Sequence, residues 1–205
     1  MSVSSHVPGP VGPLQVRFTL PPNPKGGQVA VICHPHPLHE GNMNNKVVST
    51  LERACRDSGL PVAVFNFRGV GESAGVHDHA VGEIDDCLAV IDWAVREAGA
   101  SSLVLGGFSF GSYVAAAAST RLQPGLKLRQ LLLIAPPVHH YPMASLGLTP
   151  DTLVVQGDAD EIVPPEAVYA WAGQAGLLVE RLSGCSHFFH GRLPELKQIV
   201  VNQLI

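Results

Sequence analysis

The chain lacks any cluster of basic residues and carries few charges altogether. Its 205 residues include 13 Lys and Arg against 17 Asp and Glu, for a formal net charge of −4. Nucleic acids and anionic membranes are recognised by positive charge concentrated on one face of a protein. Here the basic residues are scattered, so we expect neither a nucleic-acid nor a membrane partner. A small molecule is the expected ligand, and the sequence is compatible with a homo-oligomer.

Paired cysteines, the pattern of a signal peptide and a membrane-length apolar run are also lacking. The four cysteines form no CxxC pair, and three of them fall in apolar patterns, so reduced and mostly buried thiols are expected. The opening MSVSSHVPGPVGP has neither the basic start nor the apolar stretch of a signal peptide, which favours a cytoplasmic location. The apolar run 103–118 is interrupted by Gly and Ser and is too short to span a membrane. It is therefore interpreted as a buried strand and helix.

What the chain does have is a regular alternation of strand-length apolar runs and helical stripes. Hydrophobic residues make up 46% of it, and no linker or repeat interrupts it, so we expect one domain over residues 1–205. The alternation is typical of parallel strands joined by helices, an α/β fold of about seven strands with helices on both faces. Strands are predicted over 14–20, 28–33, 61–67, 102–106, 129–135, 152–156 and 177–182, and helices over 43–55, 84–98, 111–120, 165–174 and 193–204. The first strand is expected to form an antiparallel edge.

The most informative motif is Gly107-Phe108-Ser109-Phe110-Gly111, which fits G-x-S-x-G between a predicted strand and a predicted helix. Such a turn lifts a serine to its tip on a strained backbone, and small glycines let the chain close beneath it. A serine hydroxyl is a weak nucleophile until an imidazole accepts its proton, and a carboxylate must orient that imidazole. The motif therefore predicts an acid and a histidine later in the chain.

Candidates for the acid and for the histidine follow in loops after late strands. The segment GDADEIVP at 157–164 supplies Asp158 and Asp160, and GCSHFFHG at 184–191 supplies His187 and His190. Asp160 is the favoured acid, because it lies farther past its strand and can reach back, whereas Asp158 suits a turn. His187 is favoured as the base because it comes first after its strand.

Together these segments resemble the α/β-hydrolase superfamily, in particular the small serine hydrolases without a cap that carry HPHP after an early strand. The matching segments are GFSFG, GDADEIVP, SHFFHG, HPHPLHEGNMNN at 34–45 and FRGVGES at 67–73. The resemblance implies a Ser109, His187, Asp160 triad, with the base directly before the Phe-Phe pair. It also implies hydrolysis of a small carboxylic ester without a cofactor, and it assigns the HPHP segment to the oxyanion hole. Pro35 and Pro37 have no N–H, so His36, with Phe110, is the expected backbone donor.

Other interpretations of the motifs are weaker. Residues 34, 36 and 39 are histidines that could share a zinc ion, but no acidic or cysteine partner stands at ligand spacing. Residues 69–74 fit a dinucleotide-binding G-x-G-x-x-A, yet the helix that should follow at once is delayed to about residue 80. His77, Asp78 and His79 are interpreted as a solvated loop.

The segment before the acid loop bears on access to the serine. Only residues 136–151 separate two predicted strands, enough for a loop or one helical turn but too few for a folded cap. We expect an open site for short acyl groups, with His139, His140, Tyr141 and Met143 at its rim. Transfer of the acyl group to an acceptor other than water, and a binding protein without catalysis, are the alternative functions.

Overall fold

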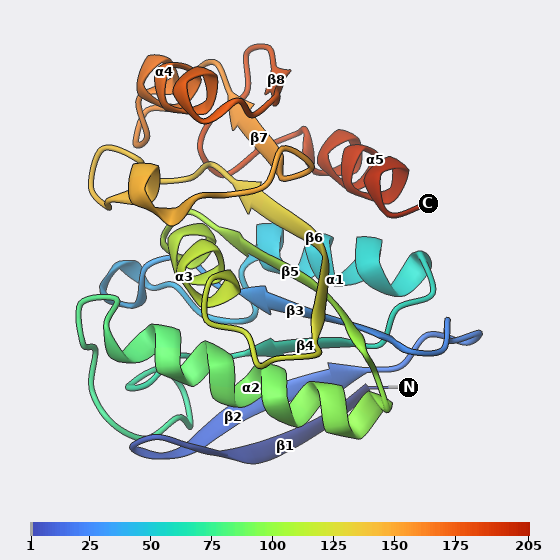
Figure 1. Ribbon diagram of the computed structural model, residues 1–205. Helices are drawn as coiled ribbons and strands as arrows, with labels where there is room; N and C mark the ends of the chain where they lie inside the picture. Colours follow the sequence, from blue (N-terminus) through green and yellow to red (C-terminus); the bar gives the residue numbers. More distant parts are fainter. Residues whose placement is uncertain (1) are drawn as a thin grey trace.

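A computed structural model describes residues 2–205, which are built on one eight-stranded sheet (Figure 1). The strands lie in the order β1-β2-β4-β3-β5-β6-β7-β8, and all pairs from β4 onward in that order are parallel. Their bounds are β1 (Ser2–Gly9), β2 (Gly12–Thr19), β3 (Gln28–Cys33), β4 (Val62–Phe65), β5 (Ser102–Phe108), β6 (Lys127–Ile134), β7 (Leu153–Gly157) and β8 (Val179–Leu182). The predicted α/β-hydrolase fold is confirmed, with eight strands in place of about seven.

The antiparallel edge differs from the prediction. β2 is antiparallel to β4 as expected, but it is not the edge, because β1 pairs along its other side. Of the residues in β1 only Val7 is buried, and the strand contains Pro8. A strand that is exposed and interrupted by proline has no apolar pattern to predict it, since its backbone bonds to β2 hold it in place.

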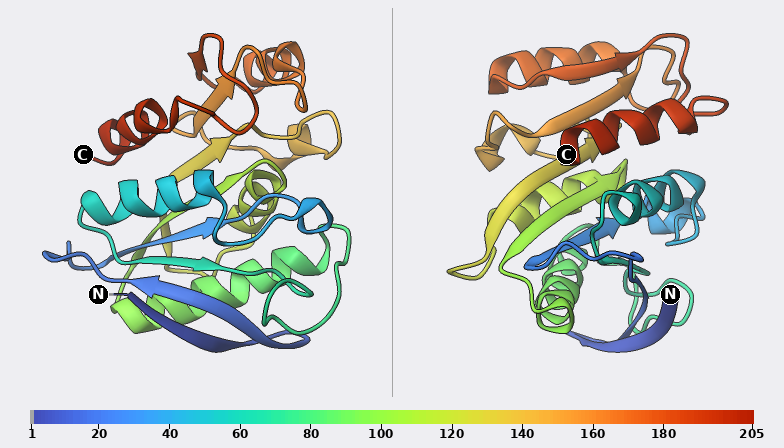
Figure 2. Two further views of the ribbon diagram at one scale, coloured as in Figure 1. Left: turned by 180° about the vertical axis from the view of Figure 1, so that it is seen from behind. Right: turned by 90° about the vertical axis from the view of Figure 1, so that its right-hand side faces the viewer.

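Within residues 2–205, five α-helices cover both faces of the sheet (Figure 2). Side chains of α2 (Gly82–Ala98), α3 (Phe110–Ser119) and α4 (Pro165–Ala175) share one core cluster, and those of α1 (Lys46–Asp57) and α5 (Leu193–Leu204) share the other. A strand covered on both faces sends successive side chains into opposite core clusters, and β3 shows this alternation. Val29, Val31 and Cys33 enter the first cluster, while Ala30 and Ile32 enter the second.

Because β3, β5, β6, β7 and β8 are parallel, the loops that follow them leave the same edge of the sheet. The segments that carry the motifs therefore meet at that edge. The connection from β6 to β7 contains a single 3-10 turn (Met143–Leu146), so no cap covers this edge, as predicted. Met143 itself is buried and does not lie at the rim. Within residues 2–205, no helix combines the length and apolar character needed to cross a membrane.

Candidate active site

Ser109 stands at the tip of the turn between β5 and α3, in a backbone conformation that side chains rarely adopt. Its φ is 52° and its ψ −121°, and its N–H donates to the carbonyl of Ile134 at 2.8 Å. A Cβ added at Gly107 would overlap the carbonyl of Gly111, and one at Gly111 would overlap the carbonyl of Cys33. Both outer glycines of GFSFG are therefore required, because no larger side chain fits at either position. The turn presents the serine side chain away from the core.

The loops after β7 and β8 bring Asp160 and His187 together. Asp160 Oδ2 lies 2.8 Å from His187 Nδ1, and both side chains are almost completely buried. The second oxygen, Oδ1, accepts the N–H groups of Ile162 at 2.9 Å and Val163 at 2.7 Å. The Nε2 of Gln156 donates to Oδ2 at 2.9 Å. The carboxylate is thus fixed from every side, and it fixes the imidazole in turn.

These contacts also keep Asp160 ionised. Burial by itself would raise the pKa of the carboxyl, because it penalises the charged form. The hydrogen bond and charge of His187, with the N–H groups of Val163 and Ile162, outweigh this, so the pKa of Asp160 lies below its ordinary value. A carboxylate that stays charged can stabilise an imidazolium beside it.

Ser109 and His187 face a common cavity of about 280 Å³, which Phe188 and Ile162 also line. Within residues 2–205, Ser109 Oγ makes no hydrogen bond. Hydrogen bonds between a nucleophile and its base are often open in a free enzyme and close only when substrate is bound. The neighbouring Ser112 is buried and donates to the Ser109 carbonyl at 2.6 Å, so its hydroxyl is already engaged.

The HPHP segment wraps around the same cavity. His34 is buried, with Nδ1 2.6 Å from the carbonyl of Pro35 and Nε2 accepting the N–H of Phe67 at 3.1 Å. Both of its ring nitrogens are therefore engaged, Nδ1 within the HPHP segment and Nε2 by the FRGVGES segment. The carbonyl of His36 accepts the N–H groups of His39 and Gly41, which closes the loop into a tight turn.

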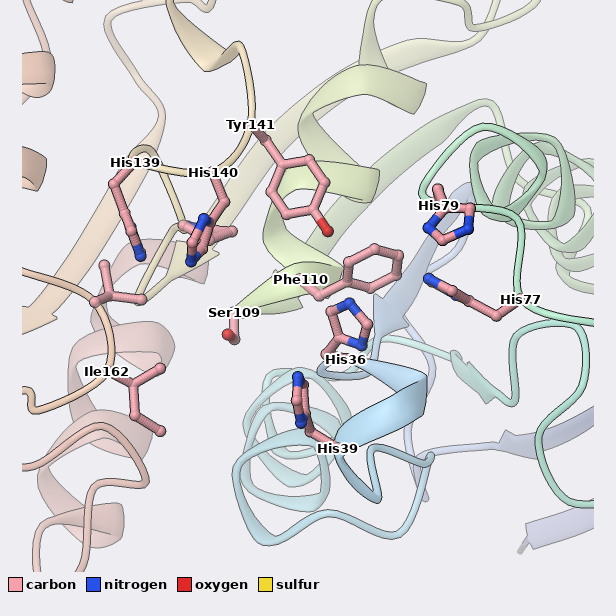
Figure 3. Close-up of a pocket in the computed structure, with 12 residues that line it drawn as sticks. His36, His39, His77, His79, Ser109, Phe110, His139, His140, Tyr141 and Ile162 are labelled. Carbon is pink, nitrogen blue, oxygen red and sulfur yellow. The ribbon is translucent and has the colours of Figure 1, made fainter.

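A larger cleft of about 470 Å³ opens around Ser109, and its walls are rich in histidine (Figure 3). His139, His140 and Tyr141 line it, as predicted for the rim. The assignment of residues 77–79 to a solvated loop is wrong for His77, whose side chain is 8% exposed and faces the cleft. Asp78 and His79 are exposed. Sequence spacing alone could not reveal this, because the side chain of His77 lies against a buried partner in the helix that follows.

That partner is Glu83 in α2. Its carboxylate is completely buried, accepts the N–H groups of Asp78 at 2.8 Å and Ala80 at 2.9 Å, and lies 2.9 Å from His77 Nδ1. The last contact has the distance of an ion pair but not the alignment of a hydrogen bond. Glu83 therefore fixes the loop that carries His77 into the cleft.

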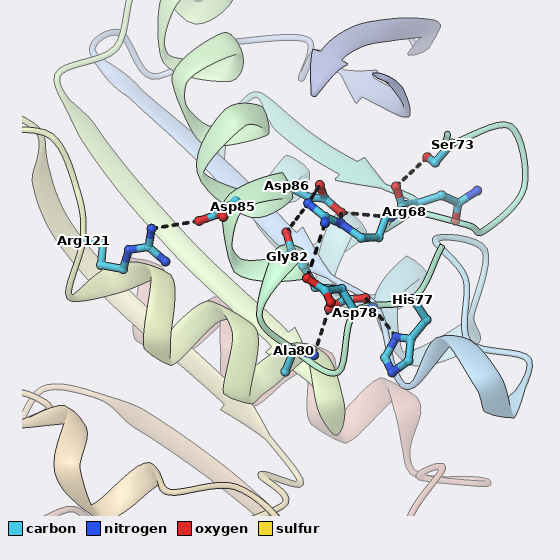
Figure 4. A network of polar contacts seen from close by, with 11 residues as sticks. Arg68, Ser73, His77, Asp78, Ala80, Gly82, Asp85, Asp86 and Arg121 are labelled. Atoms are coloured by element: carbon cyan, nitrogen blue, oxygen red, sulfur yellow. Dashed lines mark hydrogen bonds and ion pairs between the residues drawn. The ribbon is translucent and has the colours of Figure 1, made fainter. Parts of the chain in front are cut away.

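Arg68 ties the neighbouring FRGVGES loop to the same helix (Figure 4). Asp86 Oδ1 accepts Arg68 Nη2 at 2.7 Å, and Oδ2 accepts both Nε and the backbone N–H of Arg68. Arg68 Nη2 also donates to the carbonyl of Gly82 at 2.7 Å. The pair is nearly closed to water, with side-chain exposures of 7% for Arg68 and 0% for Asp86.

We expect Asp86→Ala to lower the free energy of unfolding by about 3–5 kcal/mol, because it removes the carboxylate that binds the buried guanidinium of Arg68 at two nitrogens. Asp85→Ala is the matched control, since Asp85 pairs with Arg121 on the surface and such pairs contribute at most about 1 kcal/mol. Urea denaturation of the two variants measures the difference. Equal losses for both would contradict the role assigned to the buried pair.

The remaining candidates lie apart from this centre. Asp158 Oδ1 accepts the N–H of Gly184 at 2.6 Å and so joins two loops. His190 is exposed and its ring contacts Phe188. All four cysteines are buried and unpaired, in agreement with the prediction.

The lidless α/β sheet, with a serine at the turn between β5 and α3, places the protein in the class of α/β serine hydrolases. A family model described as X-Pro dipeptidyl-peptidase (S15 family) matches residues 13–145, and the chain belongs to this family. The match ends before Asp160 and His187.

Solved structures agree with this class. An α/β serine hydrolase homologue from Coxiella burnetii is 45% identical, with a TM-score of 0.91 over 99% of this chain and 97% of that one. XC6422 from Xanthomonas campestris, described as an α/β serine hydrolase without lid, is 41% identical, with a TM-score of 0.91 over 99% of this chain and 93% of the other. The uncharacterized protein RP471 of Rickettsia prowazekii is 35% identical over 96% of this chain and 86% of its own length.

Proposed function

We propose that the protein hydrolyses small carboxylic esters through a covalent acyl-enzyme, with Ser109 as nucleophile, His187 as base and Asp160 as the orienting carboxylate. The observation that carries this proposal is the buried Asp160–His187 pair, which faces the same cavity as the serine. Labelling with a fluorophosphonate, followed by an ester panel, tests the mechanism first and the acyl preference second.

The steps follow from the arrangement of these groups. Ser109 Oγ attacks the ester carbonyl while its proton passes to His187 Nε2, and the imidazolium is stabilised by Asp160 at Nδ1. Collapse of the tetrahedral intermediate breaks the bond to the alkoxy oxygen, which takes the proton from His187. A water molecule then gives a proton to His187 and attacks the acyl carbon, releasing the acid and restoring the serine.

The oxyanion hole is proposed to consist of the backbone N–H groups of Phe110 and His36. Phe110 is the first residue of α3, where an N–H has no partner within the helix. Pro35 and Pro37 cannot donate, and within residues 2–205 no backbone carbonyl accepts the N–H of His36. The rings of His36 and Phe110 lie 4.9 Å apart beside Ser109 (Figure 3).

The family description raises the alternative of an X-Pro peptide substrate. A dipeptidyl-peptidase acts at a chain end that carries an ammonium group, and a bound ammonium is normally paired with a carboxylate. Among the described residues lining the two cavities at Ser109 there is no Asp or Glu. This favours an ester over such a peptide.

The open cleft gives water access to the acyl-enzyme, which favours hydrolysis over transfer of the acyl group to another acceptor. Product analysis with added alcohols distinguishes hydrolysis from acyl transfer.

Asp160→Asn is expected to lower kcat about 10⁴-fold, because a neutral amide does not stabilise the imidazolium and its NH2 group can donate to Nδ1, which favours the wrong imidazole tautomer. Asp158→Asn, two residues earlier, is the matched control, because its side chain bonds a loop N–H and not the imidazole. We expect it to retain most of its activity. Steady-state kinetics on one short ester compares the two variants. Loss of activity in Asp158→Asn with near-normal activity in Asp160→Asn would make Asp158 the triad acid.

We expect activity to stop rising once the acyl chain is longer than a few carbons. Burial yields roughly 0.8 kcal/mol per methylene, and a cleft without a lid can bury only the first few carbons. The check is kcat/KM across p-nitrophenyl esters from acetate to palmitate. A steady rise toward palmitate would refute the open-site interpretation.

A further inference from the structure

Four histidines form one wall of the cleft beside Ser109, on the side of the proposed oxyanion hole (Figure 3). The ring of His36 lies 4.8 Å from that of His39 and 5.0 Å from that of His77, and His77 lies 5.1 Å from His79. We call these residues the imidazole wall. They come from two segments, the HPHP turn after β3 and the loop before α2, so their contact is made by the fold and not by spacing in the sequence.

The cleft contains no charged side chain that could balance a positive charge on the imidazole wall. Among the described residues that line it, none is Asp, Glu, Lys or Arg. The carboxylate of Glu83 lies 2.9 Å from His77, but it is buried and already accepts two backbone N–H groups. Asp78 lies 3.7 Å from the guanidinium of Arg68, which is itself held by Asp86. Any charge that develops on the wall is therefore positive.

The groups that face the wall from the other elements do not add a free negative charge to the cleft. His139 and His140 lie across Ser109 from the wall, and Tyr141, on the same connection after β6, packs against Phe110. Beyond them, Asp160 is held against His187 and is nearly closed to water. The cleft thus offers a ligand six imidazoles and a phenol.

Without a ligand, His36 in the wall resists protonation. Burial, together with repulsion from His77 and His39, lowers the pKa of His36 to about 4. The pKa of His139 on the opposite side is also lowered, by burial and by its neighbour His140. A negative charge placed among these rings would remove the repulsion and supply the missing partner, so protonation and anion binding must favour each other.

We propose that the imidazole wall is a subsite for a carboxylate carried by the substrate ester, and that such an ester binds with uptake of protons by the wall. The proposal rests on the ester hydrolysis proposed above and names the class of ester. At high pH the rings are neutral and give the carboxylate no advantage. As the pH falls, they take up protons in the complex, and the carboxylate is bound with opposite charge.

The kinetic test compares anionic esters with neutral isosteres. One arm places the carboxylate on the acyl side, with p-nitrophenyl hydrogen succinate against p-nitrophenyl methyl succinate. The other places it on the alcohol side, with the acetate ester of 4-hydroxybenzoate against that of its methyl ester. The measured quantity is the ratio of kcat/KM for the anionic ester to that for the neutral one, in which the titration of the catalytic base cancels. In at least one arm the ratio should rise about tenfold from about pH 8 to about pH 6.

Variants assign this rise to the wall. His39 and His79 are exposed, so the double variant His39→Gln, His79→Gln leaves the packed interior intact, and it should remove most of the rise. His77→Gln should do the same. His6→Gln is the matched control, because His6 lies on β1 and pairs with Glu72 away from the cleft. It should leave the ratio as in the unaltered protein.

Binding without turnover separates this proposal from the proposed reaction. In Ser109→Ala, calorimetry with succinate should show binding that is several-fold tighter at about pH 6 than at about pH 8 and that His77→Gln weakens, whereas neutral succinamide should show no such dependence. If no ester is hydrolysed but succinate binds in this way, the subsite stands and the esterase proposal falls. A flat ratio in both arms together with pH-independent or absent succinate binding would overturn the subsite.

Discussion

Ser109→Ala is expected to lower turnover of a short ester by about 10⁴- to 10⁶-fold and to abolish labelling by a fluorophosphonate. Alanine keeps the small Cβ at a position where φ is 52°, so the turn is no more strained than before. The loss is therefore expected to come from the missing hydroxyl. Circular dichroism and thermal unfolding of the variant check that the fold is retained.

Ser186→Ala is the control for this result. Ser186 lies one residue before His187, and its carbonyl accepts the N–H of Phe189 whatever its side chain. We expect the variant to label and turn over close to normally. Labelling of Ser186 or Ser112 in the unaltered protein, found by mass spectrometry of peptides, would show that Ser109 is not the nucleophile.

The parallel part of the fold could be predicted from the sequence because most of its strands are buried on both faces. β3 and β5 consist mostly of apolar residues in unbroken runs, and in a chain with helical stripes between such runs this pattern indicates the strands of a parallel sheet. The loops at the carboxyl ends of these strands then had to meet. This is why Ser109, Asp160 and His187 could be named together before the structure placed them at one edge.

β1 and the imidazole wall could not be predicted, for different reasons. β1 is held by backbone hydrogen bonds to β2, and such bonds require no particular pattern of side chains in the sequence. His77 enters the cleft because a buried carboxylate, Glu83, fixes its loop from the next helix. Buried acidic residues are rare, so a Glu at the start of a helix is ordinarily interpreted as a favourable charge at the helix end. Only the packing of α2 against the sheet reveals the contact.

His187→Gln is expected to cost about as much turnover as loss of the serine, on the order of 10⁶-fold, because it removes the one imidazole that Asp160 orients to take the proton of Ser109 as the bond forms. Glutamine keeps an amide that can bond to Asp160, which limits the disturbance of a carboxylate that also bonds Gln156, Ile162 and Val163. The expected defect is thus in kcat, with the fold retained.

His190→Gln separates the base from the other histidine of the same loop. Its ring is exposed and contacts only Phe188 among the described aromatic residues, so we expect near-normal kcat and an unchanged pH-rate profile. The acidic limb of that profile, measured with a neutral ester, reports the group that must be unprotonated to accept the serine proton. Whatever slow turnover His187→Gln retains should have lost this limb. If the limb persists in His187→Gln and disappears in His190→Gln, His190 is the base, and the Asp160–His187 pair serves only to hold the loops together.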